Sequence, residues 1–190
     1  SSRHTMSQDA IIALMVPLAR EGRPVLRLKG GDSYIFGRGG EEAQALALAG
    51  VPFQVIPGLS AAQGAGASVG IPLTHRDHAR SLVFATGHLR GNGEVDLDWP
   101  MLARPRQTVV IYMGVANLPV ICSRLIAHGL ASDTPAAIVE RATLADERCI
   151  RGSLATLPAL ARANRVAPPA LIIVGQVVDL QPLLSQAGET

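Results

Sequence analysis

The chain has 190 residues, of which 48% are hydrophobic and 17% are charged, so it can form a hydrophobic core and is not a disordered protein. The net charge of +2 is too small for a protein that coats nucleic acid. Cys122 and Cys149 form no CxxC pair, and no Cys/His group has zinc-ligand spacing, so we expect two free thiols and no metal site.

Membrane and secretion signals are not found in the sequence. No apolar run approaches the roughly 20 residues that a membrane-spanning helix needs. Residues 1–20 contain polar and charged side chains throughout, unlike a signal peptide. We therefore expect a soluble, cytoplasmic protein with no membrane or nucleic-acid partner. The chain opens without an initiator methionine and enters a helix pattern almost at once, as if an earlier part were missing.

The first part of the chain alternates helix patterns with short apolar runs. Apolar side chains recur on one side of the first helix, and Pro17 within it indicates a kink or a later start. The expected elements, in chain order, are a helix over 8–21 capped by Ser7, a strand over 24–28, a helix over 41–50 closed by Gly50, a strand over 51–58, and a helix or loop of small residues over 59–70.

Glycine-rich stretches follow both expected strands. Gly30, Gly31 and Asp32 come directly after the strand over 24–28, and residues 59–70 follow the second strand. In open α/β sheets, ligands lie beyond the carboxyl ends of the strands. The pattern predicts an α/β fold with a mostly parallel sheet. The glycines either serve only tight turns and close helix packing, or form a ligand site, which their clustering with Asp32 favours.

The pattern restarts after residue 77. The expected elements are a strand over 81–88, a polar loop over 89–100, a strand over 107–114, a helix over 117–129, a strand over 135–143, a strand or hairpin partner over 147–157, a short helix over 158–164, a strand over 169–178, and a polar, frayed tail from Gln181. We therefore predict two α/β domains, residues 1–79 and 80–190.

Common nucleotide and hydrolase motifs do not fit. Residues 37–42 and 64–69 each lack the third glycine of GxGxxG, and no P-loop motif is present. Ser60 lacks the GxSxG pattern of a nucleophile elbow, because residue 62 is alanine. His75 and His78 lack a zinc motif, so we interpret them as hydrogen-bonded structural histidines.

Three further features of the sequence have both a structural and a functional interpretation. Arg76 is either a surface residue or points into a cleft at the domain junction, where ligand sites often lie. Met113, at the end of an apolar run, is typical of core packing. Lys29 is the only lysine, and the other 16 cations are arginine. This excess reflects codon bias, arginines that bind carboxylates or phosphates, or both.

Five segments occur in the order found in the tetrapyrrole (precorrin-type) methyltransferases. They are VLRLKGGDSYIFGRGGEEAQAL, VPFQVIPGLSAAQGAGASVGIPLTHRD, FATGHL, VVIYMG and PALIIVGQVV. The chain resembles this family from His4 to about Val178. Within the family, GRGGEE together with GIPLTHRD is typical of the branch that methylates uroporphyrinogen III at carbons 2 and 7. The product, precorrin-2, leads to sirohaem, cobalamin or haem d1.

The resemblance implies two α/β domains with the active site in the cleft between them, in a homodimer. It also implies S-adenosyl-L-methionine as methyl donor, S-adenosyl-L-homocysteine as product, and a tetrapyrrole as substrate. By similarity, the donor site is lined by Gly30, Gly31, Asp32, Ile35, Ser60, Ala61, Met113, Ala142 and Ala170. By similarity, the residues that face the tetrapyrrole are Arg38, Glu41, Arg76 and Met113, and Arg38 is the catalytic candidate for assisting removal of a ring proton.

The sequence departs from the family pattern in three places. Ser33 replaces the proline of a GGDP turn, and Ala142 replaces a glycine. The strand and GxGPGDPxLLT loop with which the family begins are not found before Ser1. Two alternatives to uroporphyrinogen methylation remain open. One is methylation of a later precorrin by the same fold, and the other is a non-catalytic remnant that dimerises or holds a ligand.

Overall fold

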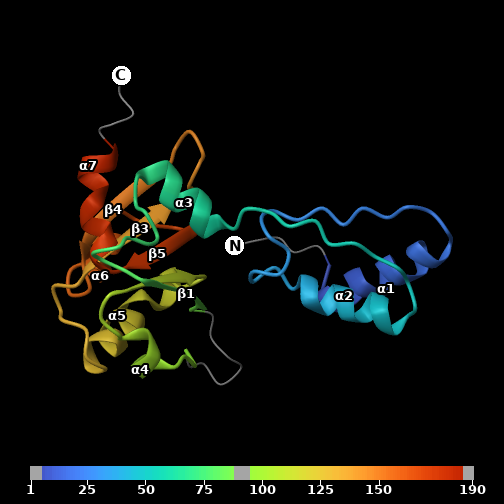
Figure 1. Ribbon diagram of the computed structural model, residues 1–190, viewed down its shortest axis with the longest axis horizontal. Helices are drawn as coiled ribbons and strands as arrows, with labels where there is room; N and C mark the ends of the chain where they lie inside the picture. The colour runs from blue at the N-terminus through green and yellow to red at the C-terminus, as the bar shows by residue number, and fades with distance from the viewer. Residues whose placement is uncertain (1–5, 88–94, 186–190) are drawn as a thin grey trace. The chain divides into compact units, whose positions relative to one another are not determined.

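Figure 1 shows the computed structural model of the chain, which describes residues 6–87 and 95–185. The chain forms two compact units, divided between Ser60 and Ala61. The predicted domains, residues 1–79 and 80–190, stay a prediction. Within the described ranges, no helix combines the length and the apolar character needed to cross a membrane.

The first unit contains the helices α1 (Gln8–Arg20) and α2 (Gly39–Leu48), close to the ranges expected from the sequence. The Ser7 hydroxyl accepts a hydrogen bond from the Ala10 N–H at 3.2 Å, so Ser7 caps α1 as predicted. Pro17 lies inside α1 and does not end it. Gly50, with φ 67°, follows the end of α2 in a left-handed conformation that favours glycine.

The strands expected over residues 24–28 and 51–58 are wrong. Both segments are without strand pairing among the residues that the structure describes, and Figure 1 shows them as long irregular runs. A strand needs ladder hydrogen bonds to a neighbouring strand, and an apolar run in the sequence does not reveal whether that neighbour is present. Leu26, Leu28 and Ile56 are accordingly 82%, 78% and 76% exposed.

The second unit is built on a five-stranded sheet with the order β1-β2-β5-β3-β4. The strands are β1 (Ser81–Thr86), β2 (Gln107–Tyr112), β3 (Pro135–Glu140), β4 (Arg148–Ser153) and β5 (Ala170–Val174). Only β1 and β2 pair in parallel among these strands, and the other three pairings are antiparallel. The short connection over residues 141–147 allows β3 and β4 to form an antiparallel hairpin, as expected.

Both faces of the sheet are buried, because alternate side chains of each strand enter different apolar layers. On one face, Val109 and Ile138 pack with α4 (Trp99–Leu102), α5 (Leu118–Ala127) and α6 (Leu157–Ala163). On the other face, Val110 and Ile173 pack with α3 (Ala61–Val69) and the 3₁₀ helix η2 (Gln176–Leu180). Figure 1 shows α3 on one side of the strands and α4 and α5 on the other.

The end of the chain and the region before α4 differ from the expectation. The last strand ends at Val174, because Gly175 turns the chain with φ 138° into η2. Helix α7 (Gln181–Ser185) forms the first part of the expected frayed tail, and residues 186–190 lie outside the described residues. Within the expected loop over 89–100, Asp98 caps α4 by accepting a hydrogen bond from the Met101 N–H at 3.0 Å. Residues 88–94 lie outside the described residues.

Candidate functional site

The loop from Gly30 to Asp32, here called the glycine loop, is shaped by close backbone contacts. Gly31 has φ 102°, a conformation that residues with side chains rarely adopt. A Cβ atom on Gly58 would lie 2.9 Å from the Gly31 carbonyl oxygen, so the two segments approach this closely only because residue 58 is glycine. A Cβ atom on Gly30 would meet no atom within 4 Å. That side of the glycine loop is therefore open to a ligand.

Asp32 ties the glycine loop to the segment that precedes α3. Its carboxylate accepts hydrogen bonds from the Tyr34 N–H at 2.8 Å and from the Gly58 N–H at 3.1 Å. The bond from Gly58 and then the bond from Tyr34 hold the pKa of Asp32 below its ordinary value. The carboxylate is therefore ionised at neutral pH and has acceptor capacity left for the hydroxyl or ammonium groups of a ligand.

A tight turn places Arg38 at the start of α2. The Gly39 N–H donates to the Ser33 carbonyl oxygen at 2.9 Å. A Cβ atom on Gly39 would lie only 2.6 Å from the same oxygen, so the turn excludes any side chain there. Arg38 precedes it with φ 57°, which is uncommon for a residue other than glycine. The turn leaves Ile35 partly exposed, at 37%.

Arg38 and Glu41 form a two-point ion pair on the surface of the first unit. Arg38 Nε donates to Glu41 Oε1 at 2.9 Å, and Arg38 Nη2 donates to Glu41 Oε2 at 2.7 Å. The hydrogen bond from Glu41 is the main reason why the pKa of Arg38 is raised above its ordinary value. Arg38 consequently stays protonated, which makes it a poor proton acceptor and a good binder of carboxylates.

In the second unit, the predicted donor-site residues gather at one edge of the sheet. Met113 follows the carboxyl end of β2, and the antiparallel strand β5 begins at that edge with Ala170. Ala170 pairs with Glu140, and the next residue, Arg141, donates from its N–H to the Pro169 carbonyl oxygen at 2.9 Å. Ala142 follows directly.

The start of α3 reaches the same edge. The Ala62 N–H donates to the hydroxyl of Tyr112, the last residue of β2, at 3.1 Å. Ala61 therefore lies beside the end of β2. Ser60, the last residue of the first unit, is 4% exposed.

The interpretation of Met113 as a core residue is wrong, because its side chain is 53% exposed. Strand β2 ends at Tyr112, and Met113 adopts φ 53°, which takes the chain out of the strand direction. A long apolar side chain at the open end of a strand suits a ligand contact better than packing.

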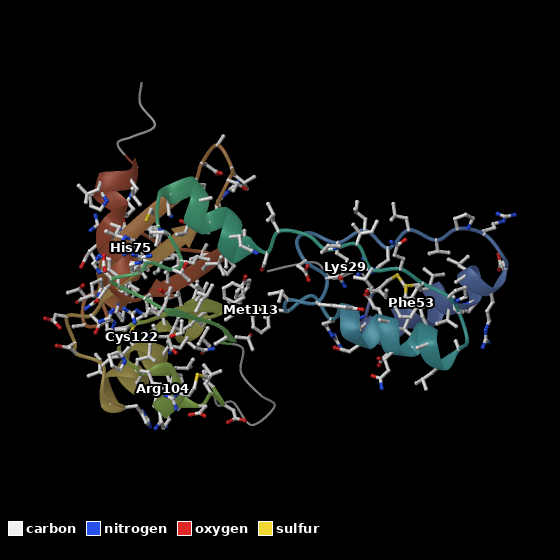
Figure 2. The ribbon with its side chains drawn as sticks, in the orientation of Figure 1. Lys29, Phe53, His75, Arg104, Met113 and Cys122 are labelled. Carbon is white, nitrogen blue, oxygen red and sulfur yellow. The ribbon has the colours of Figure 1, made fainter. Side chains whose placement is uncertain are left out.

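Arg76 lies at the opposite edge of the sheet from Met113. It is exposed, and with Thr74, His75, Ala79 and Arg80 it lines a pocket of about 630 Å³. Arg80 directly precedes β1, and its N–H donates to Arg106 just before β2. The strands between this pocket and Met113 span about 17–20 Å. Figure 2 shows His75 and Met113 on opposite sides of the unit, so one chain does not bring Arg76 and Met113 together.

His75 is a hydrogen-bonded structural histidine, as predicted. Its Nδ1 accepts from the Asp77 N–H at 3.2 Å, and its ring centre lies 4.8 Å from that of His78. Residues 6–87 and 95–185 contain no group of His, Cys, Asp or Glu side chains arranged to hold a metal ion. Both cysteines are free, and burial raises the pKa of the Cys122 thiol to about 11.

Two buried carboxylates beside the candidate site were missed by the sequence analysis. Glu42 is 4% exposed, and Glu140 is 5% exposed. Glu140 binds Arg148 and accepts from the Ala167 N–H at 3.0 Å. The available signal for Glu42 was its place in an acidic pair near the only lysine of the chain. Periodicity could not have shown which acid of that pair is buried.

Comparison with known proteins defines the class to which this fold belongs. The sequence model of the family described as "Tetrapyrrole (Corrin/Porphyrin) Methylases" matches residues 1–158. The chain therefore belongs to the tetrapyrrole methylase family, which agrees with the resemblance seen in its sequence.

Individual relatives are more specific. The chain is 58% identical to siroheme synthase of Nitrosospira multiformis over 184 residues, which cover 97% of this chain and 39% of that protein. It is 60% identical to siroheme synthase of Gluconacetobacter diazotrophicus over 176 residues, which cover 93% of this chain and 37% of that protein. The chain thus spans about two fifths of the length of these curated relatives.

Solved structures of the same family are similar to both the sequence and the fold. A crystal structure of uroporphyrin-III-C-methyltransferase from Thermus thermophilus superposes with a TM-score of 0.79 at 44% identity, covering 94% of this chain and 76% of that one. The enzyme from the same organism complexed with S-adenosylhomocysteine gives a TM-score of 0.77 at 37% identity, covering 91% of this chain and 75% of that one.

Proposed function

We propose that the chain is the methyltransferase part of a protein that methylates uroporphyrinogen III at carbons 2 and 7 to give precorrin-2, with S-adenosylmethionine as donor. The observation that carries this proposal is the 44% identity to uroporphyrin-III-C-methyltransferase, which extends over 94% of this chain. The likeness to siroheme synthases favours sirohaem as the end product, with cobalamin and haem d1 as further destinations of precorrin-2.

The glycine loop fits the proposed donor. S-adenosylmethionine supplies an electrophilic methyl group, so the task of the protein is to hold and orient it. Gly30 leaves open space beside the backbone, and the ionised Asp32 is placed to accept hydrogen bonds from the donor's polar groups. The remaining residues proposed to line the donor are Gly31, Ile35, Ser60, Ala61, Met113, Ala142 and Ala170.

The proposed tetrapyrrole contacts are Arg38, Glu41, Arg76 and Met113. Uroporphyrinogen III is rich in carboxylates, and Arg38 presents a permanently protonated guanidinium with 56% of its side chain exposed. When a ring carbon gains a methyl group, the ring becomes positively charged and must lose a proton from another of its positions. Because Glu41 raises the pKa of Arg38, Arg38 assists this step by holding the substrate and stabilising charge, and the proton passes to a base other than Arg38.

We further propose a cytoplasmic homodimer of chains with two α/β domains, residues 1–79 and 80–190. The placement of Arg76 and Met113 at opposite edges of one sheet supports the dimer, since a second copy would let both residues face one tetrapyrrole. Light scattering of the purified protein measures the oligomeric state, and a monomer that is fully active would contradict this arrangement.

The first experiment tests the reaction itself. The full-length protein that contains this chain is incubated without oxygen with uroporphyrinogen III and S-adenosylmethionine, and the tetrapyrrole is followed by mass spectrometry. Two added methyl groups are expected. No product here, but methylation when a later precorrin replaces uroporphyrinogen III, would support the sister-enzyme alternative. Binding of the tetrapyrrole without any methylation would support the non-catalytic one.

Replacing Arg38 tests the substrate side of the site. Arg38→Ala is expected to raise KM for uroporphyrinogen III about tenfold or more, because a charge-assisted hydrogen bond to a carboxylate is lost. The matched control is Arg23→Ala, which removes another exposed arginine from the same unit. An Arg38→Ala enzyme with unchanged kinetics would show that the tetrapyrrole lies elsewhere.

A further inference from the structure

A buried carboxylate joins three segments of the first unit immediately before the glycine loop. Glu42 Oε1 accepts hydrogen bonds from Gln8 Nε2 at 3.0 Å and from Arg27 Nε at 3.2 Å. Glu42 Oε2 accepts from Lys29 Nζ at 3.0 Å. These four residues, here called the Glu42 cluster, connect α1 and the segment over residues 23–29 to the first turn of α2.

The Glu42 cluster is placed well away from water. The side chain of Glu42 is 6% exposed and that of Lys29 is 15% exposed, whereas Arg27 is 39% exposed at the rim. Lys29 lies on the segment that leads to the glycine loop (Figure 2). Burying a carboxylate is costly unless it is paired and hydrogen-bonded, and here two cations and one amide satisfy it. Such a fully paired group fixes the positions of its partners.

The segment over residues 23–29 needs this anchor, because it makes no strand pairing among the described residues. Lys29 is its last residue and is bonded directly to Gly30. At the other end of the glycine loop, Asp32 is fixed by the N–H groups of Tyr34 and Gly58. The open backbone of Gly30 and Gly31 is therefore fixed at both ends. Glu42 holds one end through Lys29, and the carboxylate of Asp32 holds the other.

We propose that Glu42 is a positioning residue for the methyl donor: through Lys29 it fixes the backbone of Gly30 and Gly31, without itself contacting the donor. This inference rests on the proposed donor site. Lys29 makes its contact to Glu42 with a compact ammonium group that is only 15% exposed.

The test measures donor binding rather than turnover. In the full-length protein, the affinity for S-adenosylhomocysteine is determined by calorimetry for the wild type, Glu42→Gln, Lys29→Gln and the double variant. Each single substitution is expected to weaken binding about tenfold, since a hydrogen bond between charged groups is lost. The double variant is expected to bind no more weakly than the weaker single variant, because both act through one contact. Lys29→Arg keeps the charge and should bind more tightly than Lys29→Gln.

A matched control separates positioning from general stability. Arg20 donates from Nη2 to the Ala49 carbonyl oxygen at 2.9 Å, so it also joins α1 to the end of α2, through a bond that does not involve the segment before the glycine loop. Arg20→Gln is expected to leave the affinity for S-adenosylhomocysteine unchanged. Folded Glu42→Gln protein with a lowered Tm but wild-type affinity would show that Glu42 is only structural.

Two further outcomes are distinguishable. If Glu42→Gln does not fold, the Lys29 variants carry the test, and wild-type affinity in Lys29→Gln overturns the proposal. If the wild-type protein itself fails to bind S-adenosylhomocysteine, the proposed donor site is wrong, and the positioning role fails with it.

Discussion

The two units of the chain place similar apolar runs in opposite surroundings. In the second unit, Ile172 and Ile173 of β5 are fully buried, because strands lie on both sides of β5 and helices cover both faces. In the first unit, Leu26 and Leu28 belong to a comparable run, yet they are 82% and 78% exposed. The difference shows that neighbours, rather than composition, decide whether an apolar run becomes a strand.

The two units also use their buried carboxylates differently. Glu140 ends a strand whose backbone is already fixed by ladder hydrogen bonds to β4 and β5. Glu42 is anchored to a segment without such a ladder, so the side-chain contacts of the Glu42 cluster do the positioning there. The first unit is therefore held by a few polar contacts, and the second by a continuous apolar core.

The largest predicted effect comes from removing a buried apolar side chain of the second unit and comparing it with an exposed one of the first unit. Ile172→Ala is expected to lower the free energy of unfolding of the second unit by about 2–5 kcal/mol, because it leaves a cavity in a closed core. Leu28→Ala, the matched change in the first unit, is expected to alter stability by less than about 0.5 kcal/mol. Urea unfolding followed by circular dichroism measures both.

The fluorescence of Trp99, the only tryptophan, reports the second unit specifically, since it is buried against the core beside α5. A large loss of stability in Leu28→Ala would mean that the apolar side chains of residues 23–29 are covered in solution. The contrast between an exposed apolar run in the first unit and a buried one in the second would then be wrong.

Much of the second unit could be predicted from its sequence, because its elements carry their own signals. The apolar runs of β2 and β5 and the glycine after α5 gave these elements to within a few residues. Apart from the β3–β4 hairpin, strand direction could not be predicted, since it depends on how the connections cross the sheet. For the first unit, the strand predictions were wrong because the pattern of residues 24–28 does not specify a neighbouring strand with which to pair.

The candidate site was predicted mainly by family resemblance, and the structure adds what a resemblance cannot supply. The exposure of Met113 depends on where β2 ends and on the left-handed backbone there. The burial of Glu42 depends on contacts with residues 13 to 34 positions away in the sequence. Neither follows from a local pattern. The assignment of individual residues to donor and tetrapyrrole remains a prediction.

The second prediction concerns acid. Burial would raise the pKa of Glu42, but the hydrogen bonds from Gln8 and Lys29 and the charges of Lys29 and Arg27 outweigh it, so its pKa lies below the ordinary value of 4.5. Burial of Glu140 is likewise outweighed, by the Ala167 N–H and by Arg148. Each group therefore contributes stability that is complete above pH 4.5 and is lost as pH falls through its folded-state pKa.

We expect stability to change little between neutral pH and the ordinary pKa of a glutamate, and to fall in more acidic solution. The first unit should unfold at a higher pH than the second, because no closed apolar core stabilises it when its carboxylates become protonated. Circular dichroism and Trp99 fluorescence, recorded over an acid titration, compare the two. In the Glu42→Gln variant, the unfolding of the first unit should depend less on pH. Coincident transitions of both signals would contradict a difference in how the units are held.

The smallest predicted effect comes from the residue next to Glu42. Glu41 also pairs with a cation, Arg38, but their side chains are 51% and 56% exposed. Exposed ion pairs contribute little to stability, since water and salt screen them. Glu41→Gln should therefore leave Tm unchanged, whereas Glu42→Gln should lower it. These adjacent acids differ in burial and in the number of segments that they join. A fall in Tm for Glu41→Gln as large as that for Glu42→Gln would show that charge alone, rather than the buried Glu42 cluster, stabilises the first unit.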